Sequence, residues 1–212
     1  MNNLSSCRRS FHTRQSNWFS VARHLQCSLA FAIGIVSLLS ALASLAQSRN
    51  PDNESRIVDD FGTRITKYLE LRKAEAGSPP KPTNSPAKLT ESEQQMAEEV
   101  KAARPRAKQG DIFTPEIADY LRNQIAAALH GKDGPRIRTS LQRAEPIKHV
   151  PLHVNESYPR GLPLQSMPPS LLLNLPTLPK ELEYRIVGQD LVLHDVAANL
   201  VVDIVPDAVP SP

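Results

Sequence analysis

The chain has 212 residues and a formal net charge of +3, and this positive excess belongs to its first 46 residues. That segment holds four of the 25 basic residues and no Asp or Glu, so residues 47–212 carry 21 basic and 22 acidic side chains. Because residues 47–212 are nearly neutral, their net charge gives no reason to expect nucleic-acid binding. We therefore expect no nucleic-acid partner. Both cysteines, Cys7 and Cys27, also lie in the first segment, which excludes a disulfide framework and a cysteine-based metal site from the rest.

Residues 1–46 have the layout of an export signal. A polar start with four arginines precedes the apolar stretch "CSLAFAIGIVSLLSALASLA" at residues 27–46, which ends in small side chains. Ser44 and Ala46 occupy the two positions that a signal peptidase reads, so cleavage is predicted between Ala46 and Gln47. Ala41-Leu42-Ala43 offers a second cleavage position.

The same stretch also permits an uncleaved membrane anchor. It is long enough to cross an apolar layer of about 30 Å as a helix. Both alternatives leave the arginines in the cytoplasm and residues 47–212 outside it. We therefore expect an exported protein, periplasmic or secreted, that meets the membrane only through residues 27–46 if they are retained. Arg8-Arg9 partly matches a twin-arginine signal, which leaves the export route open.

Residues 47–110 predict two helices joined by a proline-rich linker, with part of the region disordered. In residues 54–77 a buried stripe recurs at three- and four-residue steps and Gly77 marks the end. The linker "GSPPKPTNSPAK" has four prolines in twelve residues, which favours a stiff spacer. The second helix covers residues 89–108, with Thr90 and Glu93 as a capping box. The expected stripe of the first helix is Val58, Phe61, Ile65, Tyr68 and Arg72.

Residues 111–212 predict a small α+β domain, beginning with a strong helix at 115–130. Thr114 caps that helix, Pro115 suits its first turn, and Gly131 is expected to end it in a left-handed conformation. Its apolar positions form one stripe that needs a surface to pack on. A second short helix follows the turn "GKDG", with Ile137 and Leu141 on one face.

The end of the chain predicts a three-stranded antiparallel meander. The runs "EYRIV", "LVLHDV" and "NLVVDIV" are rich in β-branched residues and are separated by short turns. Tyr184 and Ile186 should share one face, and Leu200, Val202 and Ile204 another. We expect the helix at 115–130 to cover the meander. Before it, "KHVPLHV" is interpreted as an edge strand and "SLLLNLPTLP" as a segment that covers the core.

Histidines and aspartates are the candidate chemical groups. His149 and His153 have the H-x-x-x-H spacing of helical metal ligands, but Pro151 forbids a regular helix between them. On a strand the two residues would lie about 13 Å apart. His194 is the third possible metal ligand. His194 and Asp195 are neighbours whose side chains should point to opposite faces of a strand, which argues against a catalytic relay. Turn or solvent-facing positions are expected for Asp190, Asp195 and Asp203.

Three segments carry a resemblance to known proteins. "TKYLELRKAEAG", "AKQGDIFTPEIADYLR" and "ELEYRIVGQDLVLHDVAANLVVDIVPDAVP" resemble a group of uncharacterised exported bacterial proteins, most familiar among acidobacteria, over residues 55–210. The resemblance implies a bacterial periplasmic setting and no particular activity. "YRIVGQDLVLHDVAANLVVDIV" also resembles a short C-terminal hairpin of small periplasmic proteins, some linked to nickel and cobalt homeostasis.

These observations favour a non-catalytic envelope interaction or accessory protein whose partner is another envelope protein. We expect no cofactor and assign no catalytic residue. One alternative is a periplasmic hydrolase-type enzyme, which should show a pocket with two convergent titratable groups. Another is a weak divalent-metal binder, which should bring three His or carboxylate side chains together. A binding module should instead expose an apolar patch or an open strand edge.

Overall fold

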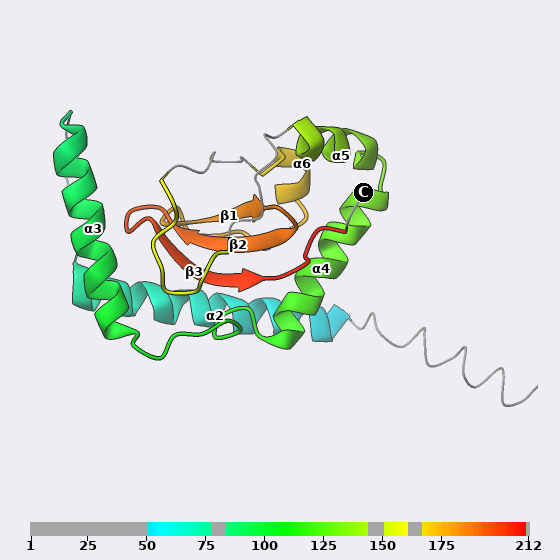
Figure 1. Ribbon diagram of the computed structural model, residues 1–212. Coiled ribbons are helices and arrows are strands. Elements are labelled where there is room, and N and C mark those ends of the chain that lie inside the picture. The colour runs from blue at the N-terminus through cyan, green and yellow to red at the C-terminus, as the bar shows by residue number, and fades with distance from the viewer. Residues whose placement is uncertain (1–50, 78–83, 144–150, 161–166, 211–212) are drawn as a thin grey trace, which may run out of the picture. The chain divides into compact units, whose positions relative to one another are not determined.

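The computed structural model describes residues 51–77, 84–143, 151–160 and 167–210 (Figure 1). The predicted cleavage position at Ala46 and Gln47 and the candidate ligand His149 lie outside these ranges. No helix within them is both long and apolar enough to cross a membrane.

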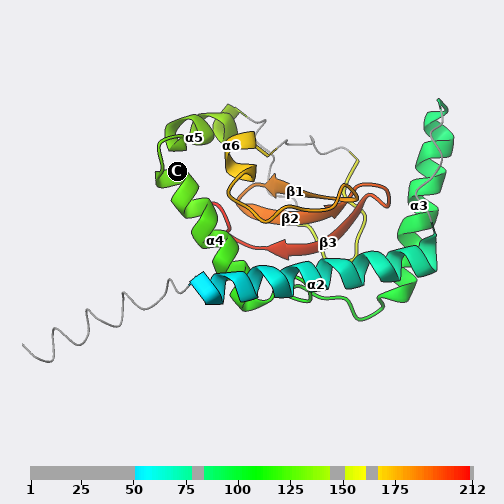
Figure 2. The same cartoon turned by 180° about the vertical axis from the view of Figure 1, so that it is seen from behind.

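Helix α2 runs from Pro51 to Ala76, and its predicted stripe is confirmed. The four residues Phe61, Ile65, Tyr68 and Arg72 are buried on one face, and Val58 is half-buried. Gly77 follows the helix with a φ of 69°, the left-handed conformation that glycine adopts without steric cost. Opposite views place α3 and α4 at the two ends of α2 (Figures 1 and 2).

Helix α3 spans Pro86–Ala103 and begins earlier than the sequence predicts. Its cap is Ser85, whose hydroxyl faces the backbone N–H of Lys88 at 3.5 Å. The predicted capping box is wrong, because Thr90 lies inside the helix. Thr90 and Glu93 instead contact the guanidinium of Arg160, at 2.6 and 3.1 Å.

Helices α4, Pro115–His130, and α5, Gly134–Arg143, form the predicted helical pair. Thr114 caps α4 by accepting from the Ile117 N–H at 3.4 Å. The expected left-handed end at Gly131 is wrong, since that residue has a φ of −74° and an extended ψ. The glycine required by packing is Gly134, because a Cβ there would lie 1.9 Å from the Leu129 carbonyl oxygen.

The C-terminal meander is confirmed. Strands β1, Leu182–Val187, β2, Asp190–Asp195, and β3, Leu200–Val205, form an antiparallel sheet in the order β1-β2-β3. Together with the helices, this sheet makes the fold α+β. A short helix α6, Pro169–Leu172, precedes the sheet.

One main hydrophobic core joins the helices to one face of the sheet. It contains buried side chains from α2 to α6 and from all three strands, so α4 shares one core with the meander and the other helices. A smaller cluster covers the opposite face, where Tyr158 packs on Val187, Val192, Val201 and Ile204.

A β-bulge in β3 overturns one expected face. Leu193 pairs with Asp203 but His194 pairs with Val201, which leaves Val202 as an extra residue. Alternation is interrupted there, so Leu200 and Val202 join the main core while Ile204 lies in the smaller cluster. Regular alternation along a strand predicts that all three residues lie on one face, and the bulge breaks that alternation.

Candidate binding groove beside strand β1

A groove of about 610 Å³ runs beside strand β1. One wall is β1, from Leu182 to Arg185, and the other is the segment around and after α6. The volume lies within the range of roughly 300–1,000 Å³ that small-ligand pockets occupy. The second wall is mainly apolar and consists of Met167, Leu172, Leu173, Leu175, Pro176, Thr177 and Leu178.

The leucine run that forms this wall only partly covers the core. Leu171 and Leu175 are buried as predicted, but Leu172 is 46% exposed and Leu173 is 87% exposed. Among the described residues, Leu173 is thus the most exposed large apolar side chain. An exposed leucine pair beside a groove is typical of a surface that contacts another molecule.

Strand β1 turns half of its backbone groups toward the side away from β2. The N–H of Val196 donates to the Glu181 carbonyl at 3.0 Å, so Glu181 faces β2, and every second residue from there does the same. The backbone N–H and C=O groups of Leu182, Tyr184 and Ile186 therefore point outward. The Leu182 N–H donates to the Pro179 carbonyl at 3.0 Å. For Tyr184 and Ile186, no other strand within the described ranges pairs with this edge, and both residues are buried, at 4% and 3% exposed.

The opposite edge of the sheet is covered. Asn155 N–H donates to the Val201 carbonyl at 2.8 Å, and Val201 N–H donates to the Glu156 carbonyl at 2.9 Å. Tyr158 N–H adds a third bond to the Asn199 carbonyl. The predicted edge strand "KHVPLHV" is wrong for its described residues 151–154, which are not a strand. The residues that pair with β3 come directly after it, where Asn155 turns the chain with a φ of 67°.

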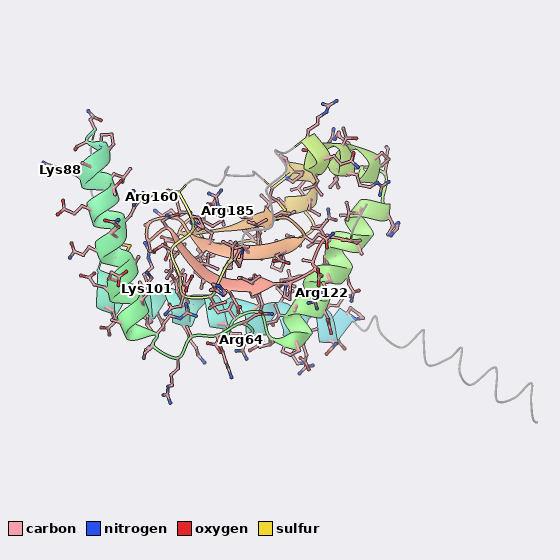
Figure 3. All side chains as sticks on the ribbon, viewed as in Figure 1. Arg64, Lys88, Lys101, Arg122, Arg160 and Arg185 are labelled. Atoms are coloured by element: carbon pink, nitrogen blue, oxygen red, sulfur yellow. The ribbon has the colours of Figure 1, made fainter. Side chains whose placement is uncertain are left out.

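A charged cluster lies at the β1 wall of the groove. Glu183 and Arg185 both line the groove and contact each other, and the Arg185 side chain is only 10% exposed while that of Glu183 is 38% exposed. Figure 3 labels Arg185 on β1. Glu183 Oε1 lies 2.9 Å from His194 Nδ1, and Arg185 Nε lies 3.3 Å from the same nitrogen. The Arg185 guanidinium also lies 5.7 Å from the centre of the Tyr158 ring.

The His194 ring is held by a chain of hydrogen bonds. The Asn199 side-chain amide donates to the Tyr158 carbonyl at 3.0 Å, which turns its oxygen toward His194 Nε2, also at 3.0 Å. Nε2 must therefore carry a proton. Both ring nitrogens face groups of the protein itself, and the His194 side chain is 4% exposed. This arrangement positions the charged cluster and leaves neither nitrogen directed at a substrate, which argues against a His194 relay.

His194 and Asp195 point to opposite sides of the sheet, as predicted. Asp195 contacts α2, where its Oδ2 accepts from the Tyr68 hydroxyl at 2.8 Å and pairs with Arg72 Nε at 3.0 Å. Its Oδ1 accepts from the N–H groups of Ala197 and Ala198, each at 3.1 Å. These two bonds give Asp195 the predicted turn role, but a solvent-facing position is wrong, because its side chain is fully buried.

Asp203 is the second aspartate that the sequence pattern misplaced. It is fully buried and accepts from the backbone N–H groups of Gly110, Ile112, Phe113 and Ile204, at 2.8 to 3.0 Å. Burial raises the pKa of this carboxyl, and the four donors lower it in part. Asp203 thereby fixes the loop before α4 to the sheet. Asp190 also has a turn role, accepting from Asp207 N–H at 3.0 Å.

Of the three candidate metal ligands, His153 and His194 lie within the described residues, and their surroundings differ. His153 is exposed and His194 is buried in its hydrogen-bond chain. No three His, Cys, Asp or Glu side chains of the described residues lie close enough to hold one metal ion.

The sequence patterns do not predict the groove. The run of three leucines is the one feature of the sequence that points to it.

Comparison of the chain with protein-family models, with curated proteins and with solved structures finds no match.

Proposed function

We propose that this chain is an exported, non-catalytic interaction protein of the bacterial envelope, and that the groove beside β1 is its contact surface. The observation that carries the proposal is the apolar wall of the groove, which holds two exposed leucines, Leu172 and Leu173. Exposed apolar side chains that line a groove mark a contact surface, because a partner that covers them removes apolar area from water.

The expected ligand is an extended segment of another envelope protein. Its apolar side chains would enter the groove and pack against this wall. Leu172 and Leu173 would lose contact with water on binding, which favours association. The setting outside the cytoplasm rests on the arginine-bearing leader and its apolar stretch.

The test is site-specific photo-cross-linking in cells that produce the full chain. Probes are placed at Leu172 and, as a matched control, at Val196, since each side chain is 46% exposed. Cross-links at Leu172 to one defined envelope protein, absent at Val196 and lost on Leu173→Asp, would support the proposal. Equal cross-linking at both positions, or no loss on Leu173→Asp, would contradict it.

A further inference from the structure

We propose that a second cavity, formed by α2, the end of α3 and the loop that leads into α4, binds a phosphate group. Its volume is about 280 Å³, and no described residue lines both this cavity and the groove beside β1. The loop runs alongside α2 in opposite views of the molecule (Figures 1 and 2). Three cations, Arg64, Lys67 and Arg104, line the cavity together with two carboxylates, Asp60 and Asp111. This inference does not depend on the envelope partner proposed above.

Both carboxylates are already engaged by the protein itself. Asp60 Oδ2 accepts from Arg64 Nε at 2.9 Å, one helical turn further along α2. Asp111 Oδ2 accepts from the backbone N–H of Lys108 at 3.0 Å, and the Asp111 carbonyl accepts from Arg64 Nη1 at 2.8 Å. Arg64 is thereby held between α2 and the loop (Figure 3). Because Asp60 and Arg64 cancel as a pair, the remaining lining charges are one carboxylate and two cations.

These two cations, Lys67 and Arg104, have no carboxylate partner among the described residues. Arg104 is half-buried, and a guanidinium has five N–H donors. Its one hydrogen bond within the described ranges runs from Nη2 to the Val202 carbonyl at 3.5 Å, and Nη1 is buried without a partner. The group is held 5.1 Å from the centre of the Tyr68 ring. Unpaired donors are unfavourable in a partly buried site, so oxygens of a bound anion would supply what Arg104 lacks.

The donor set favours phosphate among small anions. A phosphate ester carries nearly two negative charges and three acceptor oxygens, so it can accept from Arg104 and Lys67 at the same time. A guanidinium pairs with phosphate through two parallel hydrogen bonds, while a lysine acts as a point charge. Lys67 lies three residues after Arg64 on α2 and is exposed, so its side chain is free to turn toward an anion in the cavity.

The test is isothermal titration calorimetry with inorganic phosphate, at constant low ionic strength, on the full chain as it is recovered from producing cells. Lys67→Met should weaken binding by about two- to fivefold, because it removes one exposed cation. The matched control is Lys73→Met. Lys73 is an exposed lysine on the same helix that does not line the cavity, so its loss should leave the affinity unchanged. Equal weakening by both changes would mean that only the general charge of α2 attracts the anion, which would overturn the proposal.

Two further variants test the charges inside the cavity. Arg104→Met should weaken phosphate binding by about tenfold or more, since it removes the donors of the guanidinium. Circular dichroism must show that this variant is folded, because Arg104 also contacts Tyr68. Asp60→Asn should strengthen binding by about twofold or more, because it removes a repelling carboxylate and frees Arg64. An Asp60→Asn protein that binds phosphate more weakly than wild type would contradict the site.

Vesicles separate the two sources of a phosphate group. They are made of phosphatidylcholine alone, or of an equal mixture with the anionic phosphatidylglycerol. Residues 27–46, if retained, would bind vesicles in every variant, so the readout is the difference between Lys67→Met and Lys73→Met. A difference with inorganic phosphate assigns the site to a small phosphate compound, and a difference with anionic vesicles alone assigns it to a lipid headgroup. If neither probe separates the two variants, the proposal is overturned.

Discussion

The hydroxyl of Tyr68 on α2 donates to the carboxylate of Asp195 at the end of β2, at 2.8 Å and across 127 residues of chain. Arg72, one helical turn further along α2, pairs with the same oxygen at 3.0 Å. The Arg104 guanidinium closes this cluster by lying 5.1 Å from the centre of the Tyr68 ring. A buried charge is thus shared between the N-terminal helix and the sheet that forms the groove.

Asp195→Ala should lower the free energy of unfolding by about 3–5 kcal/mol, because it leaves Arg72 as an unpaired buried charge. Urea unfolding measures this loss. Asp119→Ala is the control, since Asp119 pairs with Arg122 at the surface and its removal should cost about 0–1 kcal/mol.

A double-mutant cycle separates the ion pair from general loss of packing. Adding Arg72→Met to Asp195→Ala should cost less than the sum of the two single changes, since the second change removes the unpaired charge. Strict additivity would show that Arg72 and Asp195 contribute independently.

These contacts also show where sequence patterns stop being informative. The stripe of α2, the α4 cap and the three strands follow from periodicities of 3.6 and 2, which report burial along a single element. The burial of Asp195 depends on Tyr68 and Arg72, whose distance in space no local pattern contains. An aspartate beside a turn therefore looks the same whether it is exposed or buried.

The candidate groove was beyond prediction for a related reason. "SLLLNLPTLP" contains buried Leu171 and Leu175 and exposed Leu172 and Leu173, and composition alone does not separate them. Which leucines stay exposed depends on how the segment lies against β1. The bulge at Val202 similarly breaks the alternation by a single residue, and this shift decides the face of Ile204.

Alkaline pH should destabilise the protein through its buried tyrosines. Burial, and then the charge of Asp195, raises the pKa of Tyr68, and burial raises that of Tyr184, both above the ordinary value of 10.0. Below pH 10 both states keep the phenolic proton, whereas above it only the folded state does. The free energy of unfolding should therefore fall by about 1.4 kcal/mol per pH unit for each tyrosine.

Denaturant titrations between pH 9 and 12 measure this slope. Tyr184→Phe should reduce it by the share of one tyrosine, while its lost bond to the Pro176 carbonyl costs about 1 kcal/mol at neutral pH. A slope that is unchanged in Tyr184→Phe would mean that this phenol ionises equally in both states.

Asp203 gives a pH dependence of the same sign at the acid end. Burial raises the pKa of its carboxyl above the ordinary 3.8, despite four backbone donors. Above pH 3.8 the folded state then holds the proton more tightly than the unfolded state, so stability falls as pH rises toward the folded pKa. Asp203→Asn has no such proton. The free energy of unfolding of wild type relative to Asp203→Asn should thus decline with rising pH in this range.

The measurement is a set of urea titrations of both proteins from pH 3 to 7. A relative stability of wild type that increases with pH would show that the four N–H donors outweigh burial and hold the folded pKa below 3.8. Asp203→Ala should be destabilising throughout, by about 1–3 kcal/mol or more, because four backbone N–H groups lose their acceptor.

Two glycines in helices should respond to alanine in opposite directions. At Gly134, the first residue of α5, a Cβ would lie 1.9 Å from the Leu129 carbonyl oxygen and 2.7 Å from its carbon. Both atoms are backbone, so α4 and α5 must separate, and Gly134→Ala should cost about 1–3 kcal/mol or more.

At Gly62, inside α2, no atom lies within 4 Å of the added Cβ. Gly62→Ala should therefore stabilise the protein by about 0.5–1 kcal/mol through the lower entropy of the unfolded chain. Thermal unfolding of both variants measures the pair, and a Gly134→Ala protein as stable as Gly62→Ala would mean that the α4–α5 junction is not packed as the structure shows.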